Sequence, residues 1–346
     1  MSRMLDEIRQ QPLALARTLK AEARTAAKLR AAVEKKQPRL VVMAARGTSD
    51  NAAQFGRYLI EITTGIPVCM CAPSVHTLYG SKVNYKDAVV VAISQSGEST
   101  DTNLVLEQAR AAGALTVGIT NEEESSLAKL AEHVFLVRAG KEKSVAATKT
   151  YTGQLMVLYL VACALGAKIQ HSDLERLPDL AAKALALESE IAALAGRYCF
   201  MNHAVVVGRG FNYCNAFEFA LKLMETSYVV AERFSTADFM HGPIAMVEAN
   251  FPSFLFVPSG PTWSSMQEML VRLGELKAET LVITDRKARL PEGLATRVIR
   301  LPFSVDETLT PIPYIIPAQL FAAHLAAEKG LNPDQPRTLS KVTLTL

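Results

Sequence analysis

The sequence has few of the residues that mark metal sites, disulfide frameworks or membrane spans. Its five cysteines, an odd number, include no C-x-x-C pair, and its six histidines include no H-E-x-x-H spacing. We therefore expect reduced thiols, no metal and no other cofactor. The longest apolar run, Met156–Ala167, has 12 residues, fewer than the roughly 20 that cross a bilayer. It predicts a buried helix.

The sequence also has no large excess of positive or negative charge. The net charge is only +3 over 346 residues, and no block of Lys and Arg stands out, which argues against nucleic-acid binding. The first residues, MSRMLDEIRQQP, are charged and contain no apolar segment, so no secretory signal is expected and the predicted location is the cytoplasm. Hydrophobic residues make up 49% of the chain, enough for two domain cores at this length.

Short apolar runs alternate with helical segments after a helical stretch over residues 1–37. The predicted strands are residues 40–45, 68–72, 88–94, 114–120 and 133–137. Strands that alternate with helices favour a parallel sheet wrapped by helices. Residues 146–196 are predicted to form two helices joined near residues 167–172.

The second half of the chain repeats the first. Arg209 follows Arg46 by 163 residues, and Ser259 follows Ser94 by 165, each after an apolar strand. Several elements recurring in one order indicate duplication of a whole domain. The predicted fold is α/β, with two tandem flavodoxin-like domains, each a parallel sheet flanked by helices. The predicted boundaries are a helical segment (1–37), domain 1 (38–170), a helical connector (171–196), domain 2 (197–330) and a tail (331–346).

The segment Ala92–Thr100, with the sequence AISQSGEST, joins a predicted buried strand to a helix that begins near Asp101. Hydroxyl groups and backbone N–H groups at a helix N-terminus suit an anion, and Gly97 permits close approach of the backbone. No G-K-[ST] follows, so the segment is not a nucleotide P-loop, and a single phosphate monoester is favoured. An ordinary serine cap on the helix is the alternative.

A predicted helix over residues 213–228 carries three charged residues in an otherwise apolar sequence. Glu218, Lys222 and Glu225 are spaced i, i+4 and i+7 and so share one stripe of the helix. The helix directly follows the turn at residues 208–210, at the ligand edge of a predicted sheet. An acid/base site is one interpretation, and a solvated salt-bridged face is the other. His241 before Gly242-Pro243, and Lys341 in the tail, are further candidates.

Several ordered motifs resemble the sugar isomerase (SIS) family over nearly the whole chain. They are Gly47-Thr48-Ser49, Ser94-Gln95-Ser96-Gly97-Glu98, Val145-Ala146-Ala147-Thr148-Lys149, Ala220-Leu221-Lys222-Leu223-Met224-Glu225, His241-Gly242-Pro243 and Asp334-Gln335-Pro336-Arg337, followed by Lys341. The chain is most similar to the tandem-SIS isomerase half of the glucosamine-6-phosphate synthases. Among proteins of this fold, it looks more like the stand-alone isomerising glucosamine-6-phosphate deaminases.

The resemblance implies a role for each matched residue. Glu225 would move a proton between C1 and C2 of a sugar phosphate, and Lys222 would assist. His241 would open the sugar ring from the partner subunit of a homodimer, and Lys341 would form a Schiff base with the carbonyl carbon. The residues implied to bind the substrate and its phosphate are Thr48, Ser49, Ser94, Gln95, Ser96, Ser99, Val145 and Glu218.

Three activities remain open at this point. With only about 37 residues before the first strand, no glutaminase domain is expected, which favours conversion of glucosamine 6-phosphate to fructose 6-phosphate and ammonia. A phosphosugar isomerase or a fructosamine-6-phosphate-type deglycase is the second interpretation. A non-catalytic sugar-phosphate sensor is the third, although a sensor would not need Lys222, Glu225, His241 and Lys341 together. The gluco or galacto form of the substrate is left open.

Overall fold

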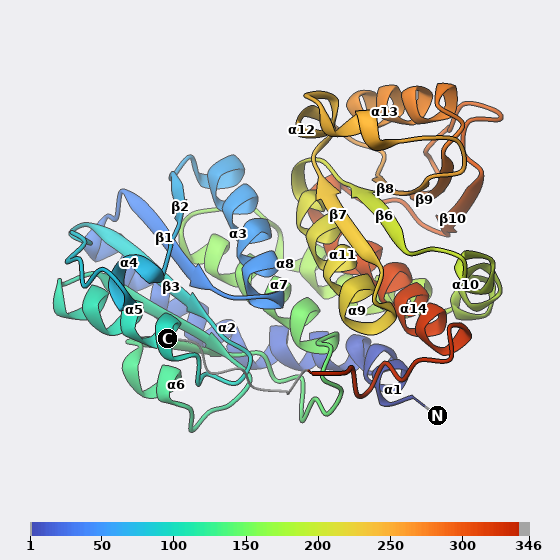
Figure 1. Ribbon diagram of the computed structural model, residues 1–346. Helices are drawn as coiled ribbons and strands as arrows, with labels where there is room; N and C mark the ends of the chain where they lie inside the picture. Colours follow the sequence, from blue (N-terminus) through green and yellow to red (C-terminus); the bar gives the residue numbers. More distant parts are fainter. Residues whose placement is uncertain (1, 339–346) are drawn as a thin grey trace. The chain divides into compact units, whose positions relative to one another are not determined.

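The chain packs into two compact units, each built on one five-stranded parallel sheet, in the computed structural model, which describes residues 2–338 (Figure 1). The N-terminal unit comprises Gln10–Glu142 and Lys149–Arg176. The C-terminal unit comprises residues 2–9, Lys143–Thr148 and residues 177–338. Each unit therefore contains one of the two sheets that the internal repeat predicts.

The N-terminal unit is a three-layered α/β sandwich. Its strands are β1 (Leu40–Ala45), β2 (Val68–Met70), β3 (Ala88–Ile93), β4 (Leu115–Thr120) and β5 (His133–Leu136), in the order β2-β1-β3-β4-β5. Its helices are α2 (Gln11–Lys36), α3 (Thr48–Thr64), α4 (Ser74–Thr77), α5 (Thr100–Ala111), α6 (Ser126–Leu130), α7 (Lys149–Ala164) and α8 (His171–Glu175). Helices α2, α3 and α7 pack together in one layer, and α4, α5 and α6 form the other.

The C-terminal unit repeats this plan. Its strands are β6 (His203–Val207), β7 (Val230–Phe234), β8 (Pro252–Val257), β9 (Glu279–Asp285) and β10 (Arg297–Leu301), in the order β7-β6-β8-β9-β10. Its α-helices are α1 (Arg3–Arg9), α9 (Leu177–Leu185), α10 (Glu188–Ala195), α11 (Tyr213–Ser227), α12 (Thr236–Met240), α13 (Trp263–Glu275) and α14 (Pro311–Glu328). Short 3₁₀ turns are η1 (Gly196–Tyr198), η2 (Gly210–Asn212), η3 (Pro243–Met246) and η4 (Glu307–Leu309).

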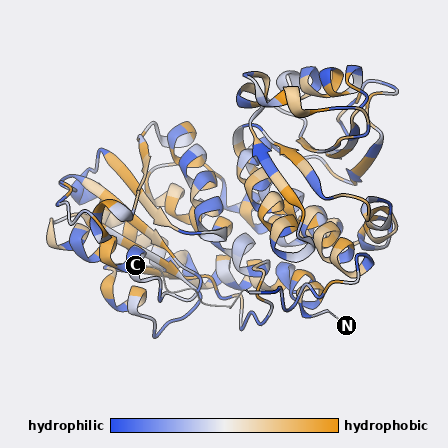
Figure 2. Cartoon of the chain, viewed as in Figure 1, coloured by the Kyte–Doolittle hydropathy of each residue, from blue (hydrophilic) through white to orange (hydrophobic). Residues whose placement is uncertain are grey.

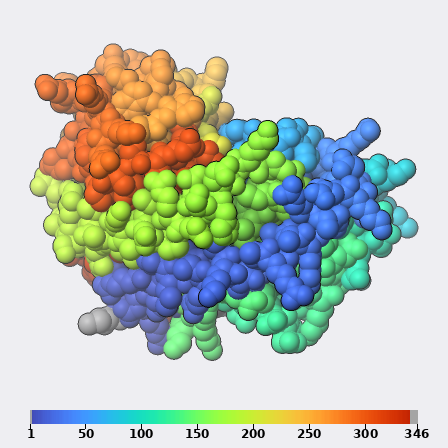
Figure 3. Space-filling model, turned by 180° about the vertical axis from the view of Figure 1, so that it is seen from behind, coloured from blue at the N-terminus to red at the C-terminus, as the bar shows by residue number. Residues whose placement is uncertain are grey.

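In the C-terminal unit, α11 packs on α14, which also contacts α9 and α10, whereas α12 and α13 cover the other face of the sheet. From behind, the lime-green surface that includes α9 and α10 borders the orange surface of the later part of this unit (Figure 3). Every residue of β3 and of β8 is buried, as expected for parallel strands covered on both faces. Figure 2 shows such apolar strands in orange beside helices that are blue on part of their surface.

The expected α/β fold with two parallel sheets is confirmed, and each predicted strand matches an observed one to within two residues. The prediction of two helices over residues 146–196 was wrong, because α8, α9 and α10 follow α7. Pro178 lies in the first turn of α9, where its missing N–H costs no helical hydrogen bond but prevents α8 from continuing. Among residues 2–338, no helix combines the length and apolarity that a membrane crossing requires.

Each sheet reverses its strand order at one point, which is where open α/β sheets bind ligands. In the first sheet this point lies between β1 and β3, and in the second it lies between β6 and β8. The turns that follow these strands begin at Arg46 and Ser94 in the first sheet. In the second sheet they begin at Gly208 and Pro258. All four turns are therefore in position to form ligand sites.

We predict that Gly208→Ala destabilises the C-terminal unit. A Cβ atom at Gly208 would lie 2.4 Å from the backbone oxygen of Asn212, so the tight turn into α11 would have to open at a cost of about 1–3 kcal/mol. Gly196→Ala is the matched control, because its φ is −57° and its nearest contact is 3.5 Å away. That change should be neutral or stabilising by about 0.4–1 kcal/mol. Urea unfolding of both variants checks this, and equal midpoints would contradict it.

Candidate functional site

The loop after β3 is held in shape by its own hydroxyl groups. Ser94 is buried, and its Oγ accepts a hydrogen bond from the N–H of Gly97 at 3.1 Å and lies 3.0 Å from Ser99 Oγ. The Gln95 carbonyl accepts hydrogen bonds from Asn121 N at 3.0 Å and from Thr120 Oγ1 at 3.3 Å. Neutral groups therefore fix the interior of the loop, and the exposed Glu98 carboxylate ties it to α6 by accepting hydrogen bonds from Ser126 N at 2.9 Å and from Ser126 Oγ at 2.7 Å.

Gly97 is the residue that this loop conformation requires. Its φ is +69°, and a Cβ atom there would lie 2.2 Å from Ser125 Oγ. The Gly97 carbonyl accepts hydrogen bonds from Asn103 Nδ2 and Leu127 N, both at 3.0 Å. These bonds tie the loop to α5 and α6, so its backbone is fixed on two sides.

Ser99 occupies the N-cap position of α5 without capping it. Its backbone is extended, yet its side chain makes no cap hydrogen bond and instead lies against Ser94. Ser125 provides a contrast, since its Oγ accepts a hydrogen bond from Ala128 N at the start of α6. The ordinary-cap alternative for this segment therefore does not describe Ser99, and the first turn of α5 keeps the positive end of its dipole directed at the loop.

A cation lies at the neighbouring turn of the same sheet. Arg46 follows β1, and its Nε donates to the Oδ2 of Asp101 at 2.7 Å. The Asp101 carboxylate is 1% exposed, whereas 53% of the Arg46 side chain is exposed. Next along the chain, Thr48 is half-buried, and Ser49 Oγ accepts a hydrogen bond from Gln154 Nε2 at 3.0 Å. Ser49 therefore joins α3 to α7.

The charged stripe of α11 is a buried ion-pair array. Lys222 Nζ lies 3.4 Å from Glu218 Oε1 and 2.6 Å from Glu225 Oε2. The side chains of Glu218 and Lys222 are fully buried, while 23% of the Glu225 side chain is exposed. The alternative of a solvated helix face is therefore wrong. The buried ammonium group of Lys222 is therefore paired with the Glu225 carboxylate, which solvent can reach. A carboxylate in that position is suited to proton transfer.

The remaining candidates lie elsewhere in the C-terminal unit. His241 is exposed at the end of α12, and its N–H donates to the carbonyl of Asp238 at 3.2 Å. Val145 is half-buried beside Ser144, whose N–H donates to Glu7 Oε2 at 3.1 Å. Lys341 lies outside the described residues. Across residues 2–338, no group of three or more His, Cys, Asp or Glu side chains is arranged to hold a metal ion.

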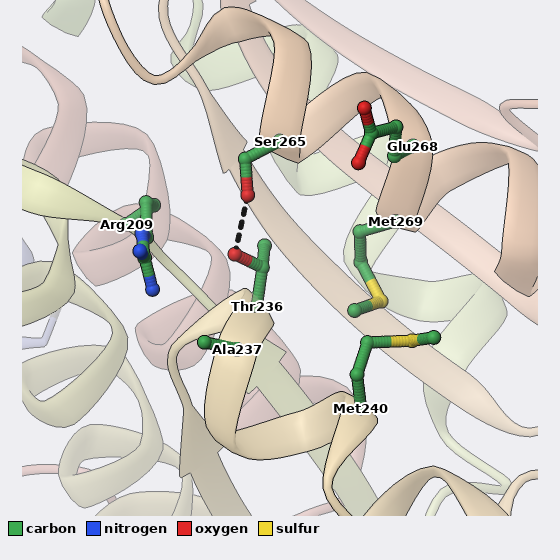
Figure 4. A pocket seen from close by; sticks show the side chains of 7 residues that line it. All are labelled: Arg209, Thr236, Ala237, Met240, Ser265, Glu268 and Met269. Atoms are coloured by element: carbon green, nitrogen blue, oxygen red, sulfur yellow. Dashed lines mark hydrogen bonds between the residues drawn. The ribbon is translucent and has the colours of Figure 1, made fainter.

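The structure adds a small cavity that sequence reasoning did not identify. It has a volume of about 200 Å³, and its walls are formed by Arg209, Thr236, Ala237, Met240, Ser265, Glu268 and Met269. In Figure 4 the hydroxyls of Thr236 and Ser265 face each other, 2.6 Å apart, with Arg209 to one side and the two methionines to the other. In the sequence, only one observation pointed to this cavity: the internal repeat aligns Arg209 with Arg46.

We predict that Lys222→Met lowers the free energy of unfolding by about 3–5 kcal/mol, because the buried Glu218 carboxylate would lose the ammonium group that lies 3.4 Å from it. Glu225→Gln should cost much less, since its side chain reaches solvent and the Glu218–Lys222 pair remains. The exposed Lys287→Met is the control for loss of one lysine, expected within about 0.5 kcal/mol of the parent. Chemical denaturation measures all three, and a Lys222→Met variant as stable as the Lys287→Met control would disprove the prediction.

Known proteins similar to this chain share both its sequence and its fold. The glutamine–fructose-6-phosphate aminotransferase (isomerizing) of Pyrococcus horikoshii is 37% identical over 346 residues, which cover 98% of this chain and 57% of that protein. The chain thus spans little more than half the length of this curated relative. The C-terminal domain of glucosamine-fructose-6-phosphate aminotransferase from Francisella tularensis matches with a TM-score of 0.86 at 27% identity, covering 97% of this chain and 98% of that one.

The glucosamine-6-phosphate deaminase of Thermotoga maritima shares the fold, with a TM-score of 0.76 at 23% identity over 99% of this chain and all of that one. The SIS domain model matches residues 35–164 and again residues 201–329. These two matches each contain one of the parallel sheets. The chain therefore belongs to the SIS domain family and carries two SIS domains in tandem.

Proposed function

We propose that this protein is an enzyme that binds a sugar 6-phosphate and transfers a proton between its C1 and C2 atoms. The observation that carries the proposal is the buried Lys222 holding the partly exposed Glu225 carboxylate at 2.6 Å. A buried cation paired with one fully buried and one partly exposed carboxylate is costly to maintain. Its retention is explained if the pair works on a substrate.

The Ser94–Ser99 loop is the proposed phosphate site. A phosphate monoester can accept hydrogen bonds from the hydroxyls of Ser96 and Ser99 and from backbone N–H groups at the start of α5. The hydroxyls provide donors without fixed charge, and the half-exposed Arg46 adds a positive field nearby. Thr48, Gln95 and the Val145 backbone are further proposed contacts of the substrate. Ser49 and Glu218 would act through packing and charge, because both are buried.

The proposed substrate is glucosamine 6-phosphate. In its open-chain form, Glu225 removes the proton from C2 and returns it to C1, so that the aldehyde and amine become a hydroxymethyl group and a C2 imine. Lys222 stabilises the negative charge that develops on oxygen. One water molecule then hydrolyses the imine, which yields fructose 6-phosphate and ammonia. The sequence resemblance to isomerising deaminases supports this substrate, and the fold match to a deaminase is consistent with it.

Three further parts of the proposal come from the family resemblance. His241 opens the sugar ring, and its exposure at the end of α12 allows it to act on a partner subunit of a homodimer. Lys341 forms a Schiff base with the carbonyl carbon of an open-chain ketose. The enzyme is proposed to work in the cytoplasm, where sugar phosphates are retained.

Isomerisation without ammonia release is the alternative, and the "isomerizing" chemistry named for the curated relatives favours it. The deciding experiment measures ammonia and ketose phosphate after purified protein is given glucosamine 6-phosphate, galactosamine 6-phosphate, glucose 6-phosphate, or fructose 6-phosphate plus glutamine. Ammonia from one amino sugar supports the proposal and identifies the epimer. Ketose phosphate formed from an aldose phosphate, with no ammonia from any mixture, supports the isomerase. No turnover of any sugar phosphate would overturn both.

We predict that Glu225→Gln lowers kcat by about 10²–10⁴-fold, the usual contribution of a general base. The amide keeps the shape of the side chain but cannot accept the C2 proton, so binding of fructose 6-phosphate should change little. Glu248→Gln, at an exposed position in the same unit, is the control and should retain full activity. Near-normal turnover by Glu225→Gln would mean that another group is the base.

We also predict that Ser96→Ala weakens binding of fructose 6-phosphate by about 10–100-fold, the effect of losing one hydrogen bond to a charged group. Ser96 Oγ accepts only a weak 3.3 Å hydrogen bond from Glu98 N, so the stability of the protein should change little. Isothermal titration with fructose 6-phosphate measures the affinity, and Ser81→Ala serves as an exposed control. An unchanged affinity would place the phosphate elsewhere.

A further inference from the structure

The second sheet contains a copy of the phosphate loop. Because β8 holds the place in its sheet that β3 holds in the first, the loop after β8, which contains Ser259, corresponds to the Ser94–Ser99 loop after β3. Helix α13 then corresponds to α5, and Asp285 at the end of β9 corresponds to Thr120 at the end of β4. The two loops have the same position at the strand-order reversal of their sheets, so they can be compared group by group.

In the second copy, carboxylates replace the neutral groups of the first. Asp285 Oδ2 accepts hydrogen bonds from Ser259 N at 2.8 Å and from Ser259 Oγ at 2.7 Å. Tyr314 Oη donates to the same oxygen at 2.9 Å. At the matching place in the first sheet, Thr120 Oγ1 donates to the Gln95 carbonyl. In the loop that begins after β8 and runs to Thr262, called the second loop below, the hydroxyl of Ser259 therefore donates to a carboxylate of the chain itself.

A second carboxylate occupies the start of α13. Glu307 lies in η4 and is 3% exposed. Its Oε2 accepts a hydrogen bond from Thr262 N at 3.0 Å, and its Oε1 accepts one from Thr262 Oγ1 at 2.9 Å. Thr262 is the N-cap residue of α13. A backbone N–H and a hydroxyl at the positive end of a helix are the donors that a bound anion would use.

The backbone around Glu307 leaves space only for this carboxylate. A Cβ atom at Gly260 would lie 2.4 Å from Glu307 Oε2, and one at Gly210 would lie 3.3 Å from Oε1. Gly210 follows β6 and Gly260 follows β8, so the carboxylate lies against both turns at the strand-order reversal. A phosphate group cannot occupy this volume while Glu307 is present.

The arrangement is not explained by stability alone. Burial raises the pKa of the Glu307 carboxyl above its ordinary value, although the hydrogen bonds from Thr262 act in the opposite direction. Holding the ionised group there therefore costs free energy at neutral pH. A neutral side chain of the same shape would avoid that cost.

We propose that the second loop is an anion site that the chain fills with its own Glu307 carboxylate, in the place that a phosphate group takes in the first loop. The inference rests on the proposed phosphate-binding role of the Ser94–Ser99 loop. It limits each chain to one sugar phosphate, bound through the first SIS domain. It also makes the second loop a latent site for phosphate or sulfate that the loss of one carboxylate would open.

The test uses the full chain with the first loop disabled by Ser96→Ala and Ser99→Ala. In this parent, Glu307→Ala, Glu307→Gln and Glu248→Ala are compared, the last as a control that removes an exposed glutamate from the same unit. Thermal unfolding is followed in inorganic phosphate and in sodium chloride of equal ionic strength. We expect phosphate to raise the Tm of Glu307→Ala by at least about 2 °C. The parent, the Glu307→Gln variant, in which the amide still fills the space, and the Glu248→Ala control should show no such rise.

Two results would overturn the inference. One is a Glu307→Ala variant that folds but is stabilised no more by phosphate than the Glu248→Ala control. The other is phosphate stabilisation of the parent, which would mean that the second loop accepts phosphate with Glu307 in place. The parent comparison remains decisive even if Glu307→Ala fails to fold. Failure of the phosphate site in the first loop would appear separately, as an unchanged affinity of the single Ser96→Ala variant for fructose 6-phosphate.

Discussion

The C-terminal unit is organised around one buried ammonium group, that of Lys222. Removing a charge from water is costly, and the cost is offset here by Glu218 at 3.4 Å and Glu225 at 2.6 Å on the same helix. Such an array requires a helix whose backbone is fixed, and α11 is fixed by packing against β6, β7 and α14. The close turn at Gly208 sets where the helix begins. The packing that fixes α11 therefore also fixes the positions of Glu218, Lys222 and Glu225 relative to one another.

The two SIS domains share a fold but differ in the charge at the strand-order reversal of each sheet. The first domain places hydroxyls and the half-exposed Arg46 there, and the buried Asp101 carboxylate is paired with that arginine. The second places Asp285 and Glu307 there, both buried and both bound to groups of its own loop. Duplication of a domain thus preserves the strand order, while a few side chains give the two copies different charges at this edge of the sheet.

The strands could be predicted from sequence because parallel strands buried on both faces read as short apolar runs, as β1 and β3 do. The stripe of Glu218, Lys222 and Glu225 could be predicted from helical spacing, but its burial could not, since spacing is the same for a solvated face. Glu307 left no signal, because it lies in a 3₁₀ turn with no periodicity and reaches its partner Thr262 across 45 residues of sequence. The break between α8 and α9 was missed although Pro178 marks it.

An internal carboxylate differs from a bound phosphate in one physical respect that bears on the whole fold. It is present at a fixed effective concentration whatever the supply of ligand, so the turns after β6 and β8 are always held around it. In the first loop, Ser99 makes no cap hydrogen bond to α5 and lies against Ser94, while the Asp101 carboxylate in the first turn of α5 is paired with Arg46 and accepts a hydrogen bond from Thr102 N. The two domains therefore hold the turns at their strand-order reversals by different means, hydroxyl groups after β3 and a buried carboxylate of the chain itself after β8.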